Sequence, residues 1–211
     1  MTHRDELLSA LGRVPVVGIL RGAPPDHAVS VGTAAVDAGI LVIEVTFDSP
    51  SPAESIARLV RAAKGAIVGA GTIRTPADVQ RAAAAGAAFI VTPMLSLPVV
   101  RASIAAGLPC IPGAATTTEI WEAVEAGATA VKVFPARELG GPAYLRAIGG
   151  PLGHPPLVPT GGVGVADAAG YLDAGALAVG IGGSVFPRDA LASGDTARVA
   201  SLASDLLESL A

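Results

Sequence analysis

Short apolar runs alternate with alanine-rich stretches along the whole chain. Eight runs rich in β-forming residues begin at Val14, Leu41, Ala66, Ala87, Leu108, Ala130, Leu157 and Leu177, at intervals of 20 to 27 residues. The stretches between them, such as ADVQRAAAA and TEIWEAVEA, contain strong helix formers with polar residues at intervals. The pattern predicts a strand–helix unit that is repeated eight times.

Glycines mark the expected helix ends. Six of the eight runs closely follow a glycine, which can adopt the left-handed conformation common at helix C-termini: Gly39, Gly65, Gly86, Gly107, Gly127 and Gly175. The segment Thr75-Pro76-Ala77-Asp78 has the residue types that favour a helix start. These signals predict helices that are bounded at both ends.

Nearly continuous apolar strands, each followed by a helix, are typical of a parallel sheet covered by helices, and eight such units can close into a barrel. We predict an α/β fold, a single (β/α)8 TIM barrel domain over residues 1–211, with an N-terminal capping helix from about Arg4 to Leu11. An open doubly wound sheet is the alternative. Its dinucleotide-binding form is disfavoured because no GxGxxG turn follows the first strand.

The composition narrows the function classes. With 51% hydrophobic residues, 15% charged residues and a formal net charge of −4, the chain has no clustered basic face for nucleic acid. Cys110 is the only cysteine, so we expect a buried thiol and no disulfide framework. The charged N-terminal segment and the lack of apolar runs near about 18 residues predict a soluble, cytoplasmic protein with no membrane partner.

Lys132 is one of only two lysines, against 12 arginines, and it lies in the apolar segment AVKVFPA. Arginine stays protonated in proteins, whereas a desolvated lysine amine can lose its proton and attack a carbonyl carbon. Lys132 is therefore the candidate nucleophile.

Strand alternation places an acid in the same interior. In LVIEVTF, Glu44 points with Val42 and Thr46 into the barrel, and the alternate residues face the helices: Leu41, Ile43, Val45 and Phe47. The same alternation in AVKVFP turns Lys132 inward with Ala130 and Phe134, and Val131 and Val133 outward.

The pair formed by Lys132 and Glu44 has two interpretations. A buried structural ion pair is one, but such pairs often add little net stability. The interpretation we favour is an iminium ion between Lys132 and a keto group, with Glu44 moving the protons.

Other candidate groups lie where strands end, which is the catalytic side of such barrels: Arg21, Thr72, Thr92 and Thr160. Two glycine clusters, PTGGVG at 159–164 and GIGGS at 180–184, end the last two strands. They suggest a phosphate site made by backbone N–H groups, although ordinary tight turns would have similar sequences. The three histidines show no metal-ligand spacing, so we expect no metal and no cofactor: His3, His27 and His154.

The segments IEVTF, GAGT, VTP, IPG, VKVFPA, PTGG and GGS, in this order, closely resemble the 2-keto-3-deoxy-6-phosphogluconate (KDPG) aldolase family over nearly the whole chain. The resemblance implies a metal-independent class I aldolase, usually a homotrimer, that cleaves a phosphorylated keto-deoxy sugar acid to pyruvate and D-glyceraldehyde 3-phosphate. It implies Lys132 as the Schiff-base lysine and Glu44 as the acid/base. Thr72, Pro93 and Phe134 would line the pyruvate pocket. The implied phosphate site is Gly161, Gly162, Gly183 and Ser184.

One position departs from the family pattern. Many members place an arginine shortly after the catalytic glutamate to bind the substrate carboxylate, and this chain has Asp48 there. We therefore assign carboxylate binding to Arg21 in ILRG, whose guanidinium can form a bidentate pair. Asp48-Ser49-Pro50 resembles the Asn-Ser-Pro of the 6-phosphogalactonate-directed relatives, so the epimer preference stays open, as does activity on 4-hydroxy-2-oxoglutarate.

Two other functions remain open. One is a sugar-phosphate isomerase or epimerase with Glu44 as the base. The other is a non-catalytic sensor that binds the phosphorylated sugar acid without releasing pyruvate.

Overall fold

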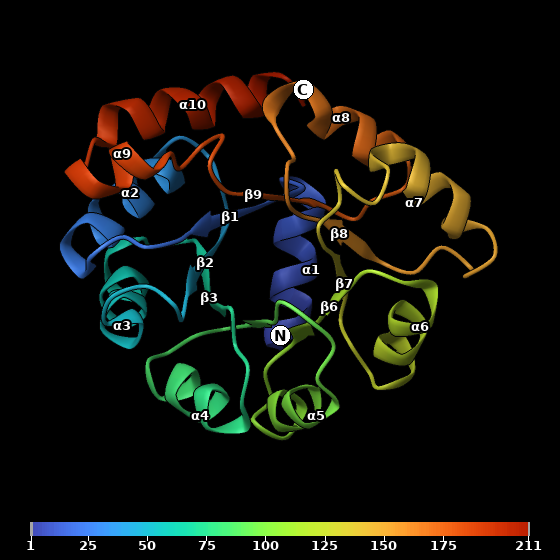
Figure 1. Ribbon diagram of the computed structural model, residues 1–211. Coiled ribbons are helices and arrows are strands. Elements are labelled where there is room, and N and C mark those ends of the chain that lie inside the picture. The colour runs from blue at the N-terminus through green and yellow to red at the C-terminus, as the bar shows by residue number, and fades with distance from the viewer. Residues whose placement is uncertain (1, 211) are drawn as a thin grey trace.

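A computed structural model describes residues 2–210 and has the predicted alternation of strands and helices (Figure 1). The strands are β1 (Val16–Leu20), β2 (Val42–Thr46), β3 (Ile67–Gly71), β4 (Ile90–Val91), β5 (Cys110–Ile111), β6 (Gly113–Ala114), β7 (Val131–Val133), β8 (Leu157–Pro159) and β9 (Val179–Ile181). The helices are α1 (His3–Arg13), α2 (Pro25–Asp37), α3 (Pro52–Ala62), α4 (Pro76–Ala84), α5 (Leu97–Ala105), α6 (Thr117–Glu125), α7 (Gly141–Gly149), α8 (Val165–Asp173), α9 (Arg188–Ser193) and α10 (Thr196–Glu208).

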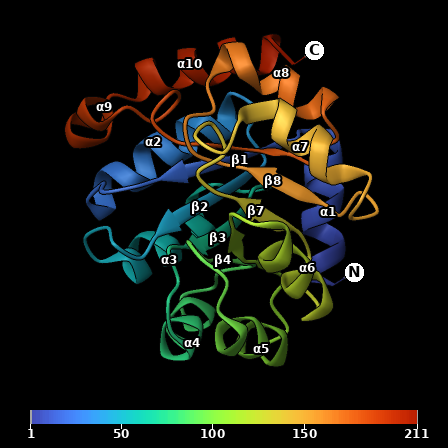
Figure 2. The same cartoon turned by 45° about the vertical axis from the view of Figure 1, so that its right-hand side comes forward.

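The strands are parallel and form a curled sheet that is surrounded by helices (Figure 1). A six-stranded part has the order β5-β4-β3-β2-β1-β9, and a three-stranded part has the order β6-β7-β8. In Figure 2 the arrowheads of β1 and β2 lie on the side away from α1. The carboxyl ends of the strands therefore face a side that α1 leaves free.

All eight predicted runs contain a strand, but the fifth run contains two. Pro112 separates β5 from β6. Proline has no N–H to donate to a ladder, and the two halves pair with different neighbours, β5 with β4 and β6 with β7.

The predicted helix boundaries are confirmed where glycine was decisive. The six helix-end glycines all have positive φ, between +72° and +114°. The Thr75 side chain accepts a hydrogen bond from the Asp78 N–H and caps α4. At the start of the chain, Thr2 and Asp5 form a capping box for α1, which is slightly longer than expected.

Buried apolar side chains form two clusters, one on each face of the strands. The outer cluster lies between strands and helices and includes Ile43, Val45, Val131 and Val133. The inner cluster joins Leu7, Ala10 and Leu11 of α1 to Val42 of β2 and to Phe89 and Ala130, which directly precede β4 and β7. Leu41, which was expected to face the helices, packs on the inner cluster. It precedes β2, so strand alternation does not constrain it.

Candidate active site

The inward face of two distant strands brings an amine and an acid together. Lys132 on β7 and Glu44 on β2 are 5% and 1% exposed, and their Nζ and Oε1 atoms are 3.8 Å apart. The Lys132 Nζ also lies 5.5 Å from the centre of the Phe134 ring. Both charged groups are therefore held out of water, as strand alternation predicted.

Glu44 occupies space that a glycine leaves open. A Cβ atom on Gly71, at the end of β3, would lie 2.6 Å from Glu44 Oε1, which is closer than real contacts allow. Between positions 2 and 210, no residue donates a hydrogen bond to Oε1. Burial raises the pKa of Glu44, and the positive charges of Lys132 and Arg21 only partly oppose that rise. The carboxyl group therefore takes up and releases its proton at a higher pH than an ordinary glutamate does.

Arg21 follows β1 and lies above this pair with two partners. Its Nη1 forms an ion pair with Asp48 Oδ2, and its Nη2 donates to Thr72 Oγ1 over 3.2 Å. Burial of Asp48 acts to raise its pKa, but hydrogen bonding to Thr46 and the charge of Arg21 outweigh it, so the pKa of Asp48 is lowered. Arginine has five N–H donors, so Arg21 keeps donors for a further anion.

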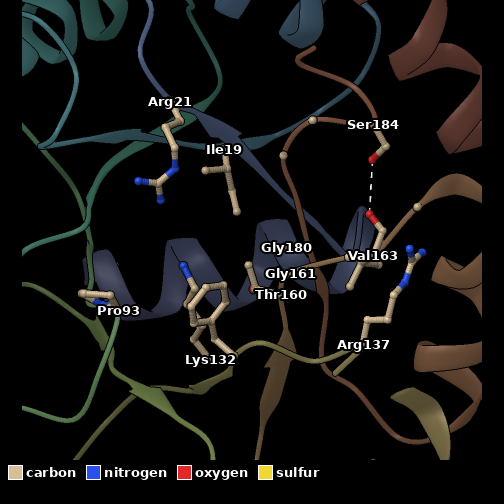
Figure 3. Close-up of a pocket in the computed structure, with 15 residues that line it drawn as sticks. Ile19, Arg21, Pro93, Lys132, Arg137, Thr160, Gly161, Val163, Gly180 and Ser184 are labelled. Carbon is tan, nitrogen blue, oxygen red and sulfur yellow. Dashed lines mark hydrogen bonds between the residues drawn. The ribbon is translucent and has the colours of Figure 1, made fainter. Parts of the chain in front are cut away.

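A cavity of about 480 Å³ opens at the carboxyl ends of the strands, where Lys132 and Arg21 point toward one another (Figure 3). Eight of the predicted site residues line it: Arg21, Pro93, Lys132, Phe134, Gly161, Gly162, Gly183 and Ser184. Glu44 lines a smaller space of about 10 Å³ beneath, which Lys132 also lines. Thr72 does not line either space and instead contacts the site through Arg21.

The two glycine clusters form one wall of the cavity. Gly161 and Gly162 have φ of +92° and +71°, a region that favours glycine. The Ser184 hydroxyl donates to the Val163 carbonyl over 3.3 Å and joins the two loops (Figure 3). Gly164, the N-cap of α8, also lines the cavity, so the backbone N–H groups of a helix start lie at this wall.

Comparisons with known proteins agree with this geometry. The family model for KDPG and KHG aldolase matches residues 7–202. The chain belongs to this family. It is 36% identical to the 2-dehydro-3-deoxy-phosphogluconate aldolase of Dickeya dadantii (strain 3937), with coverage of 96% of this chain and 93% of the relative. It is 37% identical to the 2-dehydro-3-deoxy-6-phosphogalactonate aldolase of Escherichia coli (strain K12), with coverage of 82% and 85%.

A solved structure adds the chemistry of a relative. The KDPG aldolase from Legionella pneumophila, with pyruvate captured as a covalent carbinolamine intermediate, matches with a TM-score of 0.85 and 26% identity. The match covers 95% of this chain and 97% of that chain. This member of the KDPG and KHG aldolase family is therefore an aldolase, a carbon–carbon lyase, with the α/β fold of its relatives.

Sequence analysis assigned no individual role to several residues of the aldolase cavity, and Arg137 and Ile19 were not named as candidates at all. Arg137 follows β7 in VFPAR and lines the cavity, and its Nη2 lies 2.8 Å from Asp167 Oδ2. Ile19, Thr160 and Gly180 line both spaces. A Cβ on Gly180 would lie 2.2 Å from Thr160 Oγ1, so these two residues fit together across β8 and β9. Thr160 was named as a candidate from its position at a strand end, and the same signal was available for Arg137.

Residues 2–210 contain neither a metal-binding cluster nor a membrane-spanning helix. This part of the aldolase has no group of three or more His, Cys, Asp or Glu side chains that could hold a metal ion. None of the helices in the same range is long and apolar enough to cross a membrane.

Proposed function

We propose that this aldolase is a class I enzyme that cleaves 2-keto-3-deoxy-6-phosphogluconate to pyruvate and D-glyceraldehyde 3-phosphate through a Schiff base on Lys132. One observation carries the proposal: a buried amine at the bottom of an open cavity, 3.8 Å from a buried carboxyl group whose pKa is raised. This arrangement supplies a nucleophile and a proton carrier side by side in a buried position.

In this proposal Lys132 forms the covalent bond to the substrate and Glu44 moves the protons. The Lys132 amine attacks C2 of the keto acid, and loss of water gives an iminium ion. Glu44 takes the proton of the C4 hydroxyl, and the C3–C4 bond breaks so that C4 leaves as the aldehyde carbon of D-glyceraldehyde 3-phosphate. The electron pair of that bond flows toward the iminium nitrogen and leaves an enamine on Lys132. Protonation of C3 and hydrolysis then release pyruvate and the amine. The iminium is the electron sink, so the steps need no metal and no cofactor.

Two anion subsites orient the substrate in this proposal. The remaining donors of Arg21 bind the carboxylate, and Pro93 and Phe134 line the pyruvate end, while Thr72 accepts a hydrogen bond from Arg21 and helps to hold it there. The backbone N–H groups of Gly161, Gly162 and Gly183, with the Ser184 hydroxyl and the start of α8, bind the phosphate. The support is their position around one cavity, with Arg21 on the side of Pro93 and Ser184 across from it (Figure 3).

The 6-phosphogalactonate epimer is the second candidate substrate. It is supported by the similarity to the Escherichia coli 2-dehydro-3-deoxy-6-phosphogalactonate aldolase and by Asp48-Ser49-Pro50 after β2. The family model also includes KHG aldolases, so 4-hydroxy-2-oxoglutarate is a third. An isomerase or epimerase is less well supported, because it leaves the buried Lys132 without a role.

Borohydride trapping tests the covalent step. Incubation with pyruvate and borohydride, followed by peptide mass spectrometry, should add a reduced pyruvyl group to Lys132. The exposed Lys64 is the internal control and should stay unmodified. Lys132 without an adduct would contradict the proposal. Pyruvate release from both phosphorylated epimers and from 4-hydroxy-2-oxoglutarate, coupled to lactate dehydrogenase, then ranks the substrates.

For the whole molecule we propose a closed (β/α)8 barrel in one domain, with α1 covering its amino-terminal end. Hydrogen bonds across the two gaps between the sheet parts support closure: Thr129 N–H to the Cys110 carbonyl and Leu177 N–H to the Leu157 carbonyl. A bridge between Thr160 and Gly180 adds to the second.

We also propose the homotrimer that the resemblance implies and a cytoplasmic location. Large apolar side chains are exposed near the amino-terminal end of α5, on α5 and on α6, and would be covered by a second copy: Met94, Ile104 and Trp121. Light scattering after gel filtration tests the assembly, and a monomeric mass would contradict it.

A further inference from the structure

Arg137 is a positive charge on the wall of the cavity that the glycine clusters form. Its backbone N–H donates to the Gly161 carbonyl over 3.1 Å, and its side chain crosses the face of Gly162. A Cβ on Gly162 would lie 2.6 Å from Arg137 Cβ and 2.9 Å from its Cδ. The glycine therefore leaves room for the aliphatic part of this arginine to lie along the loop.

The current partner of Arg137 is a carboxylate in the first turn of α8. Arg137 Nη2 lies 2.8 Å from Asp167 Oδ2, and the two side chains are 60% and 44% exposed. Exposed ion pairs of this kind contribute little to stability. Another anion can therefore replace Asp167 as the partner of the Arg137 guanidinium with little loss of folding free energy.

Asp167 would also oppose a phosphate at this wall. A phosphate near the start of α8 gains from the helix dipole but is repelled by a carboxylate in the same turn. Arg137 neutralises that carboxylate and has donors suited to phosphate oxygens. Its charge thus acts in two ways that both favour phosphate.

We propose that Arg137 is a specificity-determining residue that binds the phosphate of the substrate and exchanges Asp167 for it when the substrate enters. The inference rests on the proposed function, because it assigns Arg137 to the phosphate end of the same cavity. A purely structural ion pair between the β7–α7 loop and α8 is the alternative.

The two interpretations predict different signs for two substitutions. If Arg137 binds phosphate and Asp167 competes for it, Arg137→Gln weakens binding and Asp167→Asn strengthens it. If the pair is structural, loss of either partner disturbs the loop in the same way. Calorimetric titration with glycerol 3-phosphate, using glycerol as the uncharged control ligand, measures both signs.

We expect Arg137→Gln to weaken glycerol 3-phosphate binding roughly tenfold, the loss typical of one charge-assisted hydrogen bond. Asp167→Asn should tighten it roughly threefold at low salt, since only one surface charge is removed. Arg137→Lys should retain part of the affinity. Arg146→Gln on α7 is the matched control for charge, because Arg146 is exposed and does not line the cavity, and it should bind as the unmodified protein does.

Three results would overturn the proposal: no binding of glycerol 3-phosphate to the unmodified protein, unchanged affinity in Arg137→Gln, or changes of the same sign in Arg137→Gln and Asp167→Asn. Neither the ligand nor the measurement uses Lys132. Borohydride trapping with pyruvate, which has no phosphate, judges the lyase separately. Each proposal can therefore fail while the other stands.

Discussion

At the scale of single residues, the burial of the Glu44 carboxyl group costs free energy, and a contribution to folding stability does not explain it. Its carboxyl group is buried, and its nearest cation, the Lys132 Nζ, lies 3.8 Å from Oε1, beyond hydrogen-bonding distance. Buried pairs of this kind are often no more stabilising than apolar residues of similar volume. The proton-transfer role that we propose for Glu44 would account for this buried pair, because a carboxyl group with a raised pKa exchanges its proton at a higher pH than an ordinary glutamate does.

The raised pKa of Glu44 predicts the pH dependence of the rate. As a base Glu44 must be ionised, so the acid limb of kcat should lie above the ordinary glutamate pKa of 4.5. Glu44→Gln should lower kcat roughly 10²- to 10⁴-fold and remove this limb. Steady-state rates from pH 4 to 8 measure it, and a limb at or below pH 4.5 would contradict the role.

Folding stability should respond to the same group. The folded state holds the Glu44 proton more tightly than the unfolded state, so the contribution of Glu44 is present below pH 4.5 and is lost as pH rises through the raised folded pKa. Denaturant titrations should show this loss in the unmodified protein and not in Glu44→Gln.

The sequence was sufficient for residues whose orientation follows from strand alternation. Glu44 and Lys132 are fixed by a period of two residues, and both point inward as predicted. The ion pairs Arg21–Asp48 and Arg137–Asp167 were not predicted. They join positions 27 and 30 residues apart through loop ends, where no period sets the direction of a side chain.

At the scale of elements, the glycines of β3 leave space for side chains that come from neighbouring segments of the sheet. β2 and β3 are paired in parallel, with Thr46 opposite Gly71. Gly71 leaves space for the Glu44 carboxyl group, and Gly69 leaves space for the Phe89 ring, which a Cβ would approach to 2.4 Å. The glycines of IVGAG therefore have a packing role that hydrophobic patterning alone does not reveal.

Gly71→Ala should displace the Glu44 carboxyl group and lower kcat at least tenfold, because the added Cβ would lie 2.6 Å from Oε1. Gly12→Ala is the matched control. Gly12 lies on the exposed side of α1 with no atom within 4 Å of an added Cβ. Alanine there should raise the free energy of unfolding by about 0.5–1 kcal/mol and leave kcat unchanged. Unchanged kcat in Gly71→Ala would show that Glu44 does not need this space.

The division of the fifth predicted strand into β5 and β6 was not predicted from the sequence. The run LPCIPG predicted one strand, and the chain makes two short strands around Pro112 that face different neighbours. Proline in a strand can be recognised in the sequence, but the choice of partner on each side depends on how the sheet curls.

At the scale of the whole molecule, the apolar cluster under α1 and the open cavity lie toward opposite ends of the strands. The inner cluster joins α1 to strand residues such as Val42 and Val91, while the cavity opens at the carboxyl ends. This is the division expected for parallel sheets of this kind, in which the active site can change while the core is kept. Unfolding should therefore be followed through a probe in the core that does not touch the cavity.

Cys110 on β5 is such a probe. It is 1% exposed in the outer cluster, and burial raises the pKa of its thiol to about 11, against a smaller opposing effect of the Ser103 hydroxyl. Thiolate is the reactive form, so at pH 8 the folded protein should react with a disulfide reagent only through unfolding. Labelling should accelerate with urea as the unfolded population grows, and it should slow when pyruvate and borohydride have modified Lys132 if the adduct stabilises the folded state. Rapid labelling at pH 8 that does not depend on urea would show that β5 opens locally without global unfolding.

The raised pKa of the Cys110 thiol also predicts a pH dependence of the free energy of unfolding. The unfolded thiol ionises near pH 9.0, so the stability that this group contributes should be lost between pH 9 and about 11.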